Sequence, residues 1–352
     1  MPKSPIPTVA VVDLFCGAGG LTYGLKQEGF KVRAGVDIDP SCRYAYEKNN
    51  AAEYLQRDVK TVKGGQLNRY FLGTDFTLLA GCAPCQPFSK YTRGRGPRAD
   101  EKWTLLNQFS RLVEEISPDF VTMENVPQLA HHSILGDFEE KLQLAGYQIV
   151  VKVVRCVDYG IPQTRERLVL VASKYMAPLD LVSPHRYKKS TVRDAIGHLP
   201  PLGAGGIDPN DNLHRTSSMS ELNRQRIRAS KPGGSWKDWP KALRAKCHTK
   251  ESGDGYVSVY GRMEWDQPAP TMTTQCFGFG NGRFGHPEQH RAISLREAAL
   301  IQSFPQNYKF EPEGTNLGMK ALGRMIGNAV PVKLGVVIAR SFKQHIKHIS
   351  AV

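Results

Sequence analysis

The 352-residue sequence has no apolar run of the roughly 18 residues that a membrane-spanning helix needs. Its first residues also lack the basic and apolar regions of a secretory signal peptide. Its seven cysteines are odd in number and irregularly spaced, which argues against a framework of disulfides. We therefore expect a cytoplasmic protein that folds without disulfides and does not bind a membrane.

The sequence also lacks the cysteine pattern of a complete zinc site, which needs four ligands. Cys82-x-x-Cys85 has the spacing of half such a site, but Cys156, Cys247 and Cys276 lie singly along the chain. We therefore expect no bound metal.

A thiol follows the apolar run Phe76–Ala80, which reads as a buried strand. Open α/β sheets carry their chemistry at the carboxyl ends of strands, where Cys85 would lie. A redox pair with Cys82 would require a helix to begin at the nucleophile, whereas Pro84 and Pro87 predict an irregular loop. The pattern favours Cys85 as a lone nucleophile and Cys82 as a small buried residue at the strand end.

The formal charge of +14 predicts a polyanionic partner, and nucleic acid is the leading candidate. The segment 183–291 contains 17 lysines and arginines against 10 acidic residues, a net charge of +7. This third of the chain therefore carries half of the excess positive charge.

A glycine turn follows the first apolar run of the chain. Gly17 and Gly19 match two glycines of the G-x-G-x-x-G fingerprint, but Thr22 takes the place of the third, which disfavours a pyrophosphate-binding turn. The second and third predicted strands end at Asp37 and Asp58, where acids can accept hydrogen bonds from ribose hydroxyls. The pattern predicts a pocket for a nucleoside-like ligand without a pyrophosphate.

The segment Lys90–Lys102 is rich in glycine and basic residues and lacks periodicity, which predicts a mobile functional loop. A helix over Thr104–Ile116 and a strand over Pro118–Met123 are expected next, and this strand leads into Glu124. If it lies beside the strand that precedes Cys85, the thiol and the carboxylate form a plausible nucleophile and acid pair.

Two further apolar runs, Gln148–Val154 and Arg167–Ala172, are close enough in sequence to predict an antiparallel pair. Arg165 and Arg167, two residues apart, would point to the same side of an extended backbone.

From about Tyr187 the alternation of strands and helices disappears, which predicts a second domain. Order returns in a capped helix over 294–302 and a last helix over 332–349. Basic residues of the second domain are interleaved with aromatic residues that we expect to be core more often than DNA contacts, namely Trp236, Trp239, Tyr256, Tyr260 and Trp265.

Six motifs, in this order, resemble those of bacterial DNA (cytosine-5) methyltransferases, and together they cover nearly the whole chain. They are Asp13–Gly20, Pro84-Cys85-Gln86, Glu124-Asn125-Val126, Gln163–Arg167, Arg296-Glu297 with Leu300–Gln302, and Gly327–Pro331. Each motif alone is common by chance, but six at compatible spacing are a strong signal. The resemblance implies an α/β fold: a Rossmann-like, S-adenosylmethionine-dependent methyltransferase domain over 1–186 and 310–352, with a smaller target-recognition domain over 187–309.

The resemblance also implies roles for single residues. The catalytic set would be Cys85, Gln86, Glu124, Asn125, Arg165 and Arg167. S-adenosylmethionine would contact Phe15, Cys16, Gly17, Ala18, Gly19, Gly20, Asp37, Ile38, Asp58, Val59, Pro84, Leu105, Asn328 and Ala329. Ile38 stands where many relatives carry an aromatic residue, so the side chain against the adenine ring differs here. The basic loop predicts DNA contacts at Ser89, Lys90, Arg93, Arg95 and Arg98.

The implied reaction transfers a methyl group from S-adenosylmethionine to carbon 5 of a flipped cytosine in a specific double-stranded DNA sequence, through a covalent Cys85 adduct at carbon 6, and leaves S-adenosylhomocysteine. One alternative is a tRNA cytosine-5 methyltransferase, although Cys276-Phe277-Gly278 departs from the Cys-Phe-Thr tripeptide of such relatives. Another is a catalytically inactive DNA-binding relative, although the motifs at Cys85 and Glu124 are intact.

The resemblance finally implies a setting for the protein. It would act as a monomer in the cytoplasm, associated with the nucleoid through DNA. It would belong to a restriction-modification system, with a cognate restriction endonuclease that forms no stable complex with it.

Overall fold

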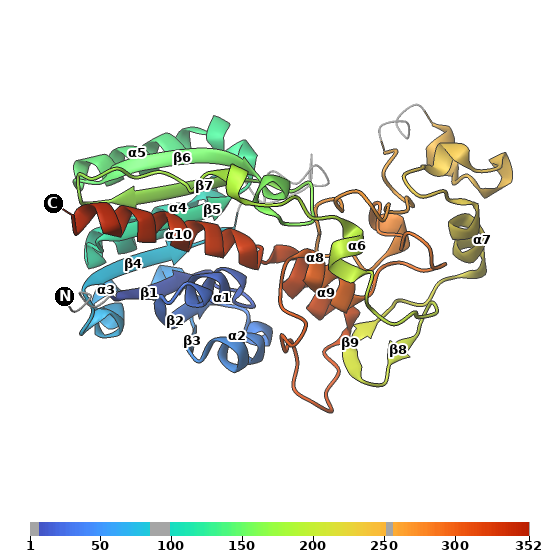
Figure 1. Cartoon of the computed structure of the whole chain (residues 1–352), viewed down its shortest axis with the longest axis horizontal. Helices are drawn as coiled ribbons and strands as arrows, with labels where there is room; N and C mark the ends of the chain where they lie inside the picture. The colour runs from blue at the N-terminus through green and yellow to red at the C-terminus, as the bar shows by residue number, and fades with distance from the viewer. Residues whose placement is uncertain (1–6, 85–98, 251–255, 352) are drawn as a thin grey trace. The chain divides into compact units, whose positions relative to one another are not determined.

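The computed structural model describes residues 7–84, 99–250 and 256–351, and the chain divides into two compact units (Figure 1). The first unit contains Met1–Arg155, Glu166–Arg186 and Val330–Val352, and the second contains Cys156–Arg165 and Tyr187–Ala329. The chain therefore leaves the first unit twice and returns to it each time. The assignment of DNA recognition to 187–309 stays a prediction, because compactness alone does not show what a unit binds.

Seven strands of the described chain form one sheet in the first unit, in the order β3-β2-β1-β4-β5-β7-β6. The first five strands are parallel, whereas β7 runs antiparallel to both β5 and β6, which confirms the predicted antiparallel pair. The strands are β1 (Val9–Leu14), β2 (Lys31–Asp37), β3 (Glu53–Gln56), β4 (Phe76–Gly81), β5 (Phe120–Asn125), β6 (Gln148–Arg155) and β7 (Glu166–Ser173).

Helices cover both faces of this sheet (Figure 1). Strands covered on both faces are buried along their whole length, as β1 and β5 are. Their sequences are therefore nearly continuous apolar runs. The helices of the first unit are α1 (Gly20–Gln27), α2 (Arg43–Asn50), α3 (Gly64–Leu67), α4 (Ala99–Ile116), α5 (Ser133–Leu144) and α10 (Val332–Ile349).

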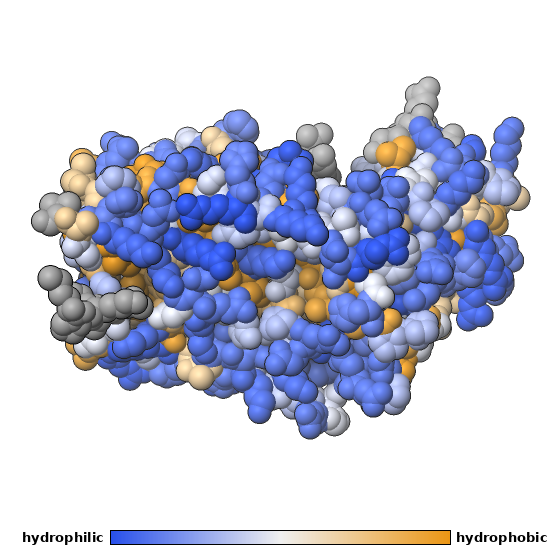
Figure 2. All heavy atoms as spheres, viewed as in Figure 1, coloured by the Kyte–Doolittle hydropathy of each residue, from blue (hydrophilic) through white to orange (hydrophobic). Residues whose placement is uncertain are grey.

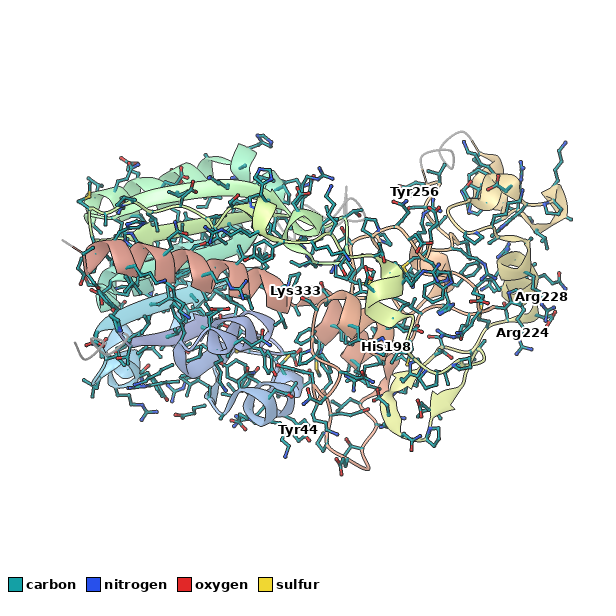
Figure 3. All side chains as sticks on the ribbon, viewed as in Figure 1. Tyr44, His198, Arg224, Arg228, Tyr256 and Lys333 are labelled. Carbon is teal, nitrogen blue, oxygen red and sulfur yellow. The ribbon has the colours of Figure 1, made fainter. Side chains whose placement is uncertain are left out.

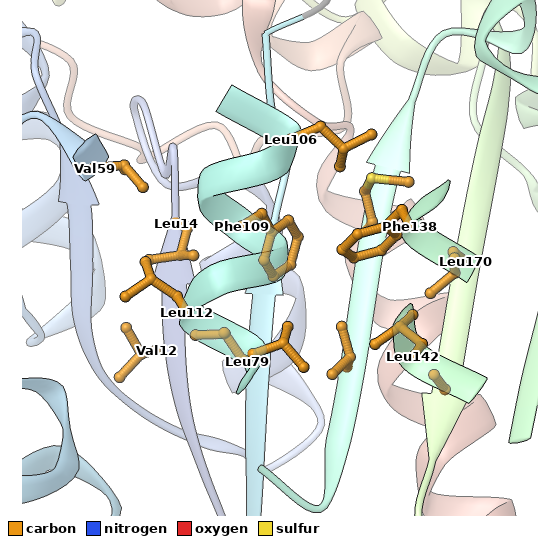
Figure 4. Close-up of a cluster of buried hydrophobic side chains, with 14 of the residues drawn as sticks. Val12, Leu14, Val59, Leu79, Leu106, Phe109, Leu112, Phe138, Leu142 and Leu170 are labelled. Carbon is orange, nitrogen blue, oxygen red and sulfur yellow. The ribbon is translucent and has the colours of Figure 1, made fainter. Parts of the chain in front are cut away.

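One apolar core lies between the sheet and helices α4 and α5 (Figure 4). Leu14 of β1 and Leu79 of β4 are fully buried there beside Phe109 of α4. The Phe109 ring lies 5.5 Å from the ring of Phe138 on α5, centroid to centroid. This packing holds β1, β4 and β5 together as one rigid platform.

Helices α1 and α10 pack closely together. A Cβ atom at Gly24 of α1 would lie 2.3 Å from the carbonyl oxygen of Val332 and 2.8 Å from the Cα of Gly335, so a larger residue there would push α10 away. Helix α10 also contacts the sheet, because the rings of Phe342 and Phe120 lie 5.2 Å apart. The last helix of the chain therefore completes the first unit.

The stretch Gly318–Ile349, within which α10 lies, is long and apolar enough to cross a membrane by length and composition. However, 78% of its most apolar window is buried inside the protein. The core helix of a folded domain can have the same length and apolar composition as a membrane-spanning helix. The burial of this stretch therefore explains its apolar composition.

The second unit contains shorter elements. They are α6 (Val192–Ile196), β8 (Ile207–Asp208), β9 (Asp211–Arg215), α7 (Glu221–Ala229), α8 (Leu295–Ile301) and α9 (Gly318–Asn328), with 3-10 turns between them. Trp236 and Trp239 are each only 2% exposed and pack with Ile227 and Phe279, which confirms that these tryptophans are core. Tyr256, by contrast, is exposed.

Helix α4 differs from its prediction. It begins at Ala99 rather than Thr104, so the last four residues of the predicted loop, Ala99–Lys102, are helical. Alanine is the best helix former, and the two acidic residues after it favour a helix N-terminus, which explains the earlier start.

Candidate active site

The carboxyl ends of β1, β4 and β5 meet at one edge of the sheet. The register pairs Leu14 of β1 with Gly81 of β4, and Gly81 with Met123 of β5. The strand that leads towards Cys85 therefore lies beside the strand that carries Glu124 near its end, as the sequence predicted. Cys85 itself lies outside the described residues, together with Gln86, Ser89, Lys90, Arg93, Arg95 and Arg98.

Glu124 is buried at this edge, with 2% of its surface exposed. Its Oε1 atom lies 2.7 Å from Nε of Arg167, which forms an ion pair. The antiparallel register places Val169 opposite Glu124, so Arg167 is its diagonal neighbour on the same face of the sheet. The N–H of Arg167 is not aligned with Oε1 as a hydrogen bond, and within the described residues Oε1 has no other hydrogen-bond donor. A buried carboxylate oxygen in this state is ready to bind a ligand.

The other oxygen of Glu124 is held by Cys82. The Cys82 thiol donates to Oε2 at a sulfur–oxygen distance of 2.8 Å. Because Gly81 pairs with Met123, the next residues along the two parallel strands, Cys82 and Glu124, come side by side. The expectation that Cys82 is only a small buried residue was wrong: it is half-buried and contacts the acid of the site.

Asn125 joins the two strand ends. Its side-chain amide donates to the carbonyl oxygen of Ala83 at 3.1 Å, and its Oδ1 accepts from the backbone N–H of Val126 at 2.8 Å. The carboxamide therefore holds the segment that runs from β4 to exposed Pro84. This is a positioning contact to the chain just before Cys85.

Arg165 and Arg167 have different partners, although the sequence predicted a shared side. Strand β7 begins at Glu166, so Arg165 precedes it and belongs to the second unit. There the buried Arg165 guanidinium donates from Nη1 to the carbonyl oxygen of Met272 at 3.0 Å. Gln163 binds the same segment, because its Oε1 accepts from the Met272 backbone N–H at 3.0 Å.

The glycine turn after β1 is built from left-handed backbone. The φ angles of Phe15, Gly17 and Gly19 are 58°, 50° and 88°, values that glycine adopts readily and phenylalanine rarely does. The backbone N–H of Gly17 donates to Oδ2 of Asp37 at 2.8 Å, so the acid at the end of β2 fixes the turn at the end of β1. Burial raises the pKa of this carboxyl above its usual value.

The turn matches the needs of a nucleoside-type ligand in a second respect. Ile38 follows Asp37 and is 65% exposed, so an apolar side chain stands in the open beside the strand-end acid. Asp58 has a local role, because its carboxylate accepts from the backbone N–H of Lys60 at 3.0 Å and caps a 3-10 turn in which Val59 is buried. Of the four residues predicted to contact the cofactor here, Ile38 is therefore open to solvent, Asp37 and Asp58 bind backbone N–H groups, and Val59 is buried.

A buried network beneath the turn was not expected from the sequence. Thr22, the residue in place of the third glycine, donates from its hydroxyl to Oδ2 of Asp13 at 2.6 Å and lies 3.2 Å from the Tyr46 hydroxyl. Burial raises the pKa of Asp13 to about 7, although the Thr22 hydrogen bond opposes the shift. The sequence of β1 carried a signal, since a single acid within a continuous apolar run must find a buried partner.

The remaining predicted ligand-binding residues are divided between the units. Cys16 and Ala18 are buried in the turn, Gly20 begins α1, and Leu105 is half-buried on α4. Asn328 and Ala329 end α9 in the second unit, where Gln302 donates to the Ala329 carbonyl oxygen at 3.0 Å. Within the described residues, no group of three or more His, Cys, Asp or Glu side chains could hold a metal ion.

Comparisons with known proteins show which sequences and folds this chain resembles. The family model described as C-5 cytosine-specific DNA methylase matches residues 9–344. The chain is 52% identical to the Type II methylase M.HgiDII of Herpetosiphon aurantiacus, over 96% of each chain. It is 33% identical to the Type II methyltransferase M1.HphI of Haemophilus parahaemolyticus, over 95% of this chain and 86% of that protein.

Solved structures share the fold. A prophage-encoded DNA modification methyltransferase from E. coli superposes with a TM-score of 0.73 at 23% identity, covering 96% of this chain and 99% of that one. The S. pombe Dnmt2 methyltransferase gives a TM-score of 0.60 at 15% identity, again over 96% and 99%.

The fold is thus that of a Rossmann-like methyltransferase, as the resemblance implied. The chain belongs to the C-5 cytosine-specific DNA methylase family, and the enzyme is a cytosine-5 DNA methyltransferase.

Proposed function

We propose that the protein methylates carbon 5 of a cytosine within a specific sequence of duplex DNA, with S-adenosylmethionine as donor and Cys85 as nucleophile. The observation that carries the proposal is the buried Glu124 carboxylate beside the strand that leads to Cys85: among the residues that the structure describes, no aligned donor reaches one of its oxygens. Such an atom fits the polar edge of a base rather than a packed protein core.

The reaction requires the target base to leave the duplex. Flipping the nucleotide into a pocket costs a few kcal/mol, which contacts in the pocket must offset. Cys85 as thiolate then forms a sulfur–carbon 6 bond, and the electron pair of the carbon 5–carbon 6 double bond makes carbon 5 electron-rich. Glu124 would deliver a proton to N3 as the thiolate attacks and accept a hydrogen bond from the exocyclic amine, so that negative charge does not accumulate on the ring, and the proton would return to Glu124 when the ring is restored.

Other residues would support this step. Arg167 and Cys82 hold the Glu124 carboxylate from its two oxygens, and Arg165 would bind the O2 side of the base. When bound, S-adenosylmethionine supplies an electrophilic methyl group, and S-adenosylhomocysteine is the product. Loss of the carbon 5 proton to water and departure of the Cys85 thiolate would restore the aromatic ring.

The donor would lie against the glycine turn, with its ribose at Asp37 and its adenine beside Ile38. The hydrogen bond between Gly17 and Asp37 and the exposure of Ile38 support this arrangement. No pyrophosphate is needed, in agreement with Thr22 in place of the third glycine.

We also propose a setting for the enzyme. Two of its relatives are named a Type II methylase and a Type II methyltransferase, which fits protection of DNA within a restriction-modification system. It would act as a monomer in the cytoplasm, bound to the nucleoid, without a stable complex with a cognate endonuclease.

Bisulfite sequencing of DNA from cells that express the protein tests the whole proposal. Cytosines within one short sequence should be protected from conversion in expressing cells and converted in cells that carry the Cys85→Ser variant. Complete conversion in both would favour the alternative of an inactive DNA-binding relative.

Replacement of Asp37 by alanine should weaken S-adenosylmethionine binding more than DNA binding. The variant loses hydrogen bonds to a charged group worth about 1.5 to 3 kcal/mol each, and the Gly17 N–H loses its acceptor. Calorimetric titration with each ligand measures both effects. Equal losses for the two ligands would contradict the placement of the ribose at Asp37.

Replacement of Cys82 by alanine should lower kcat roughly 3- to 10-fold while KM for DNA stays the same. A thiol is a weak donor, so the loss lies at the low end of a hydrogen bond to a charged acceptor. Cys82→Ser keeps a donor and should retain activity with a modest loss of stability. If the alanine variant turns over at the wild-type rate, Cys82 does not position Glu124.

A further inference from the structure

One segment of the second unit, Glu221–Lys250, carries an unusual charge. It contains nine lysines and arginines and two acidic residues, a net charge of +7 within 30 residues. Outside it, the rest of the basic region 183–291 contains equal numbers of basic and acidic residues. The whole excess of that region therefore lies in helix α7 and the turns that follow it.

Seven of the nine basic residues are exposed, and we refer to them as the basic face. They are Arg224, Arg228, Lys231, Lys237, Lys241, Lys246 and Lys250. Hydrophilic side chains cover the surface around α7 in the space-filling view, and Arg224 and Arg228 extend from that helix (Figures 2 and 3). The segment has two acidic residues: Asp238 accepts from the Ser235 backbone N–H, and Glu221 lies 3.9 Å from Arg224 and forms an ion pair with it.

The basic face stands on a packed support. Arg226 is buried with its guanidinium 5.6 Å from the Trp239 ring centroid and 5.2 Å from that of Tyr260. Its Nε donates to the carbonyl oxygen of Leu243 at 2.9 Å, which ties the turns to α7. Trp239 in turn donates from its indole N–H to the Ser230 hydroxyl at 2.9 Å. The segment is thus a rigid platform for its exposed charges rather than a solvated tail.

The electrostatic field at this surface is positive. Arg224 and Arg228, one helical turn apart, line a hollow of about 320 Å³ together with His290 and the chain at 202–204. Burial and the nearby charges of Arg262 and Arg228 lower the pKa of His290. A field that disfavours protonation of histidine favours an anion in the same place.

We propose that the basic face binds the phosphate backbone of duplex DNA outside the methylated sequence and provides a sequence-independent part of the affinity. The inference rests on the proposed function, in which duplex DNA is the substrate. Seven exposed like charges within one 30-residue segment give it a positive potential, which attracts a polyanion. Flexible lysine side chains can follow phosphate oxygens without reading base edges.

Matched triple variants test the proposal. The first, Lys231→Gln/Lys241→Gln/Lys250→Gln, removes three charges from the basic face. The control, Lys48→Gln/Lys141→Gln/Lys347→Gln, removes three exposed lysines from the first unit, on α2, α5 and α10. Thermal unfolding by circular dichroism establishes that both variants are folded.

Binding is measured as a function of salt with a duplex of about 40 base pairs and with one limited to about 12 base pairs around the methylated site. Each phosphate contact contributes about 0.9 to the slope of log K against log salt concentration. We expect the first variant to flatten that slope by up to about 2.7 with the long duplex and little with the short one. The control should match the wild type, and all three proteins should methylate the same sequence.

An unchanged slope for the first variant, or an equal change in the control, would overturn the proposal. A change in the methylated sequence would also overturn it, because the face would then read bases. A failure of the proposed function would give a different result from a failure of this inference. The wild type would then methylate no DNA, although substitution of the basic face would still flatten the salt dependence of its binding to the long duplex.

Discussion

The Cys85→Ser enzyme is expected to lose methylation almost completely and to bind DNA as the wild type does. A hydroxyl is a far weaker nucleophile than a thiolate at neutral pH, so carbon 5 of the base would not be activated. We expect kcat to fall by about 10⁴-fold or more, a loss of the size seen when a nucleophile is removed. Transfer of radiolabelled methyl groups to duplex DNA in single-turnover conditions measures this directly.

DNA binding serves as the control for that variant. The charges that attract DNA are unchanged, so the dissociation constant at a given salt concentration should stay within a factor of two or so of the wild type. Substantial turnover by the purified Cys85→Ser protein would remove Cys85 from the mechanism. Simultaneous loss of binding and activity would instead indicate damage to the site as a whole.

Glu124→Gln should produce the second largest loss, with kcat lower by about 10²- to 10⁴-fold, the range for a general acid or base. The amide cannot deliver a proton to N3 to neutralise the negative charge that develops on the ring during attack at carbon 6. The variant also leaves Arg167 without its ionic partner, with only 11% of that side chain exposed. Removing one partner of a buried ion pair lowers the free energy of unfolding by about 3 to 5 kcal/mol. Because glutamine still places a polar group beside Arg167, we expect a loss of stability of about 3 kcal/mol or less.

A double-mutant cycle separates the two effects. Glu124→Gln/Arg167→Gln removes both charges, so its free energy of unfolding should recover part of the loss of the single variant. Its kcat should stay as low as that of Glu124→Gln, because the catalytic carboxylate is still absent. Recovery of activity together with stability would mean that Glu124 has only a structural role.

Much of the fold could be predicted from local patterns. Strands β1, β4 and β5 could be recognised as short, uninterrupted apolar segments of the sequence. Their apolar residues do not alternate with polar ones because both faces of a parallel sheet are buried. The tight segment between β6 and β7 predicted their antiparallel pairing, which the register confirms. The start of α4 was misplaced by five residues, because helix ends depend on capping and context more than on periodicity.

The candidate site could be predicted only as a set of strand ends. Crossover connections indicated that Cys85 and Glu124 would follow neighbouring strands, and the pairing of β4 with β5 agrees. Arg165 and Arg167 were expected to point to the same side of one extended backbone because they are two residues apart. Strand β7 begins between them, so Arg167 contacts Glu124 while Arg165 contacts Met272 in the second unit.

The sequence by itself determined the class of sheet, the family and the residues able to perform the chemistry, because these depend on residue types, local periodicity and motif order. Only the tertiary structure decided which groups hold Glu124. Arg167 reaches it as a diagonal neighbour across an antiparallel pair, and Cys82 reaches it side by side along a parallel pair. Both contacts join residues more than 40 positions apart, and a shift of one residue in either register would turn the side chains to opposite faces. Register is set by how the whole sheet packs against its helices, so no local pattern contains it.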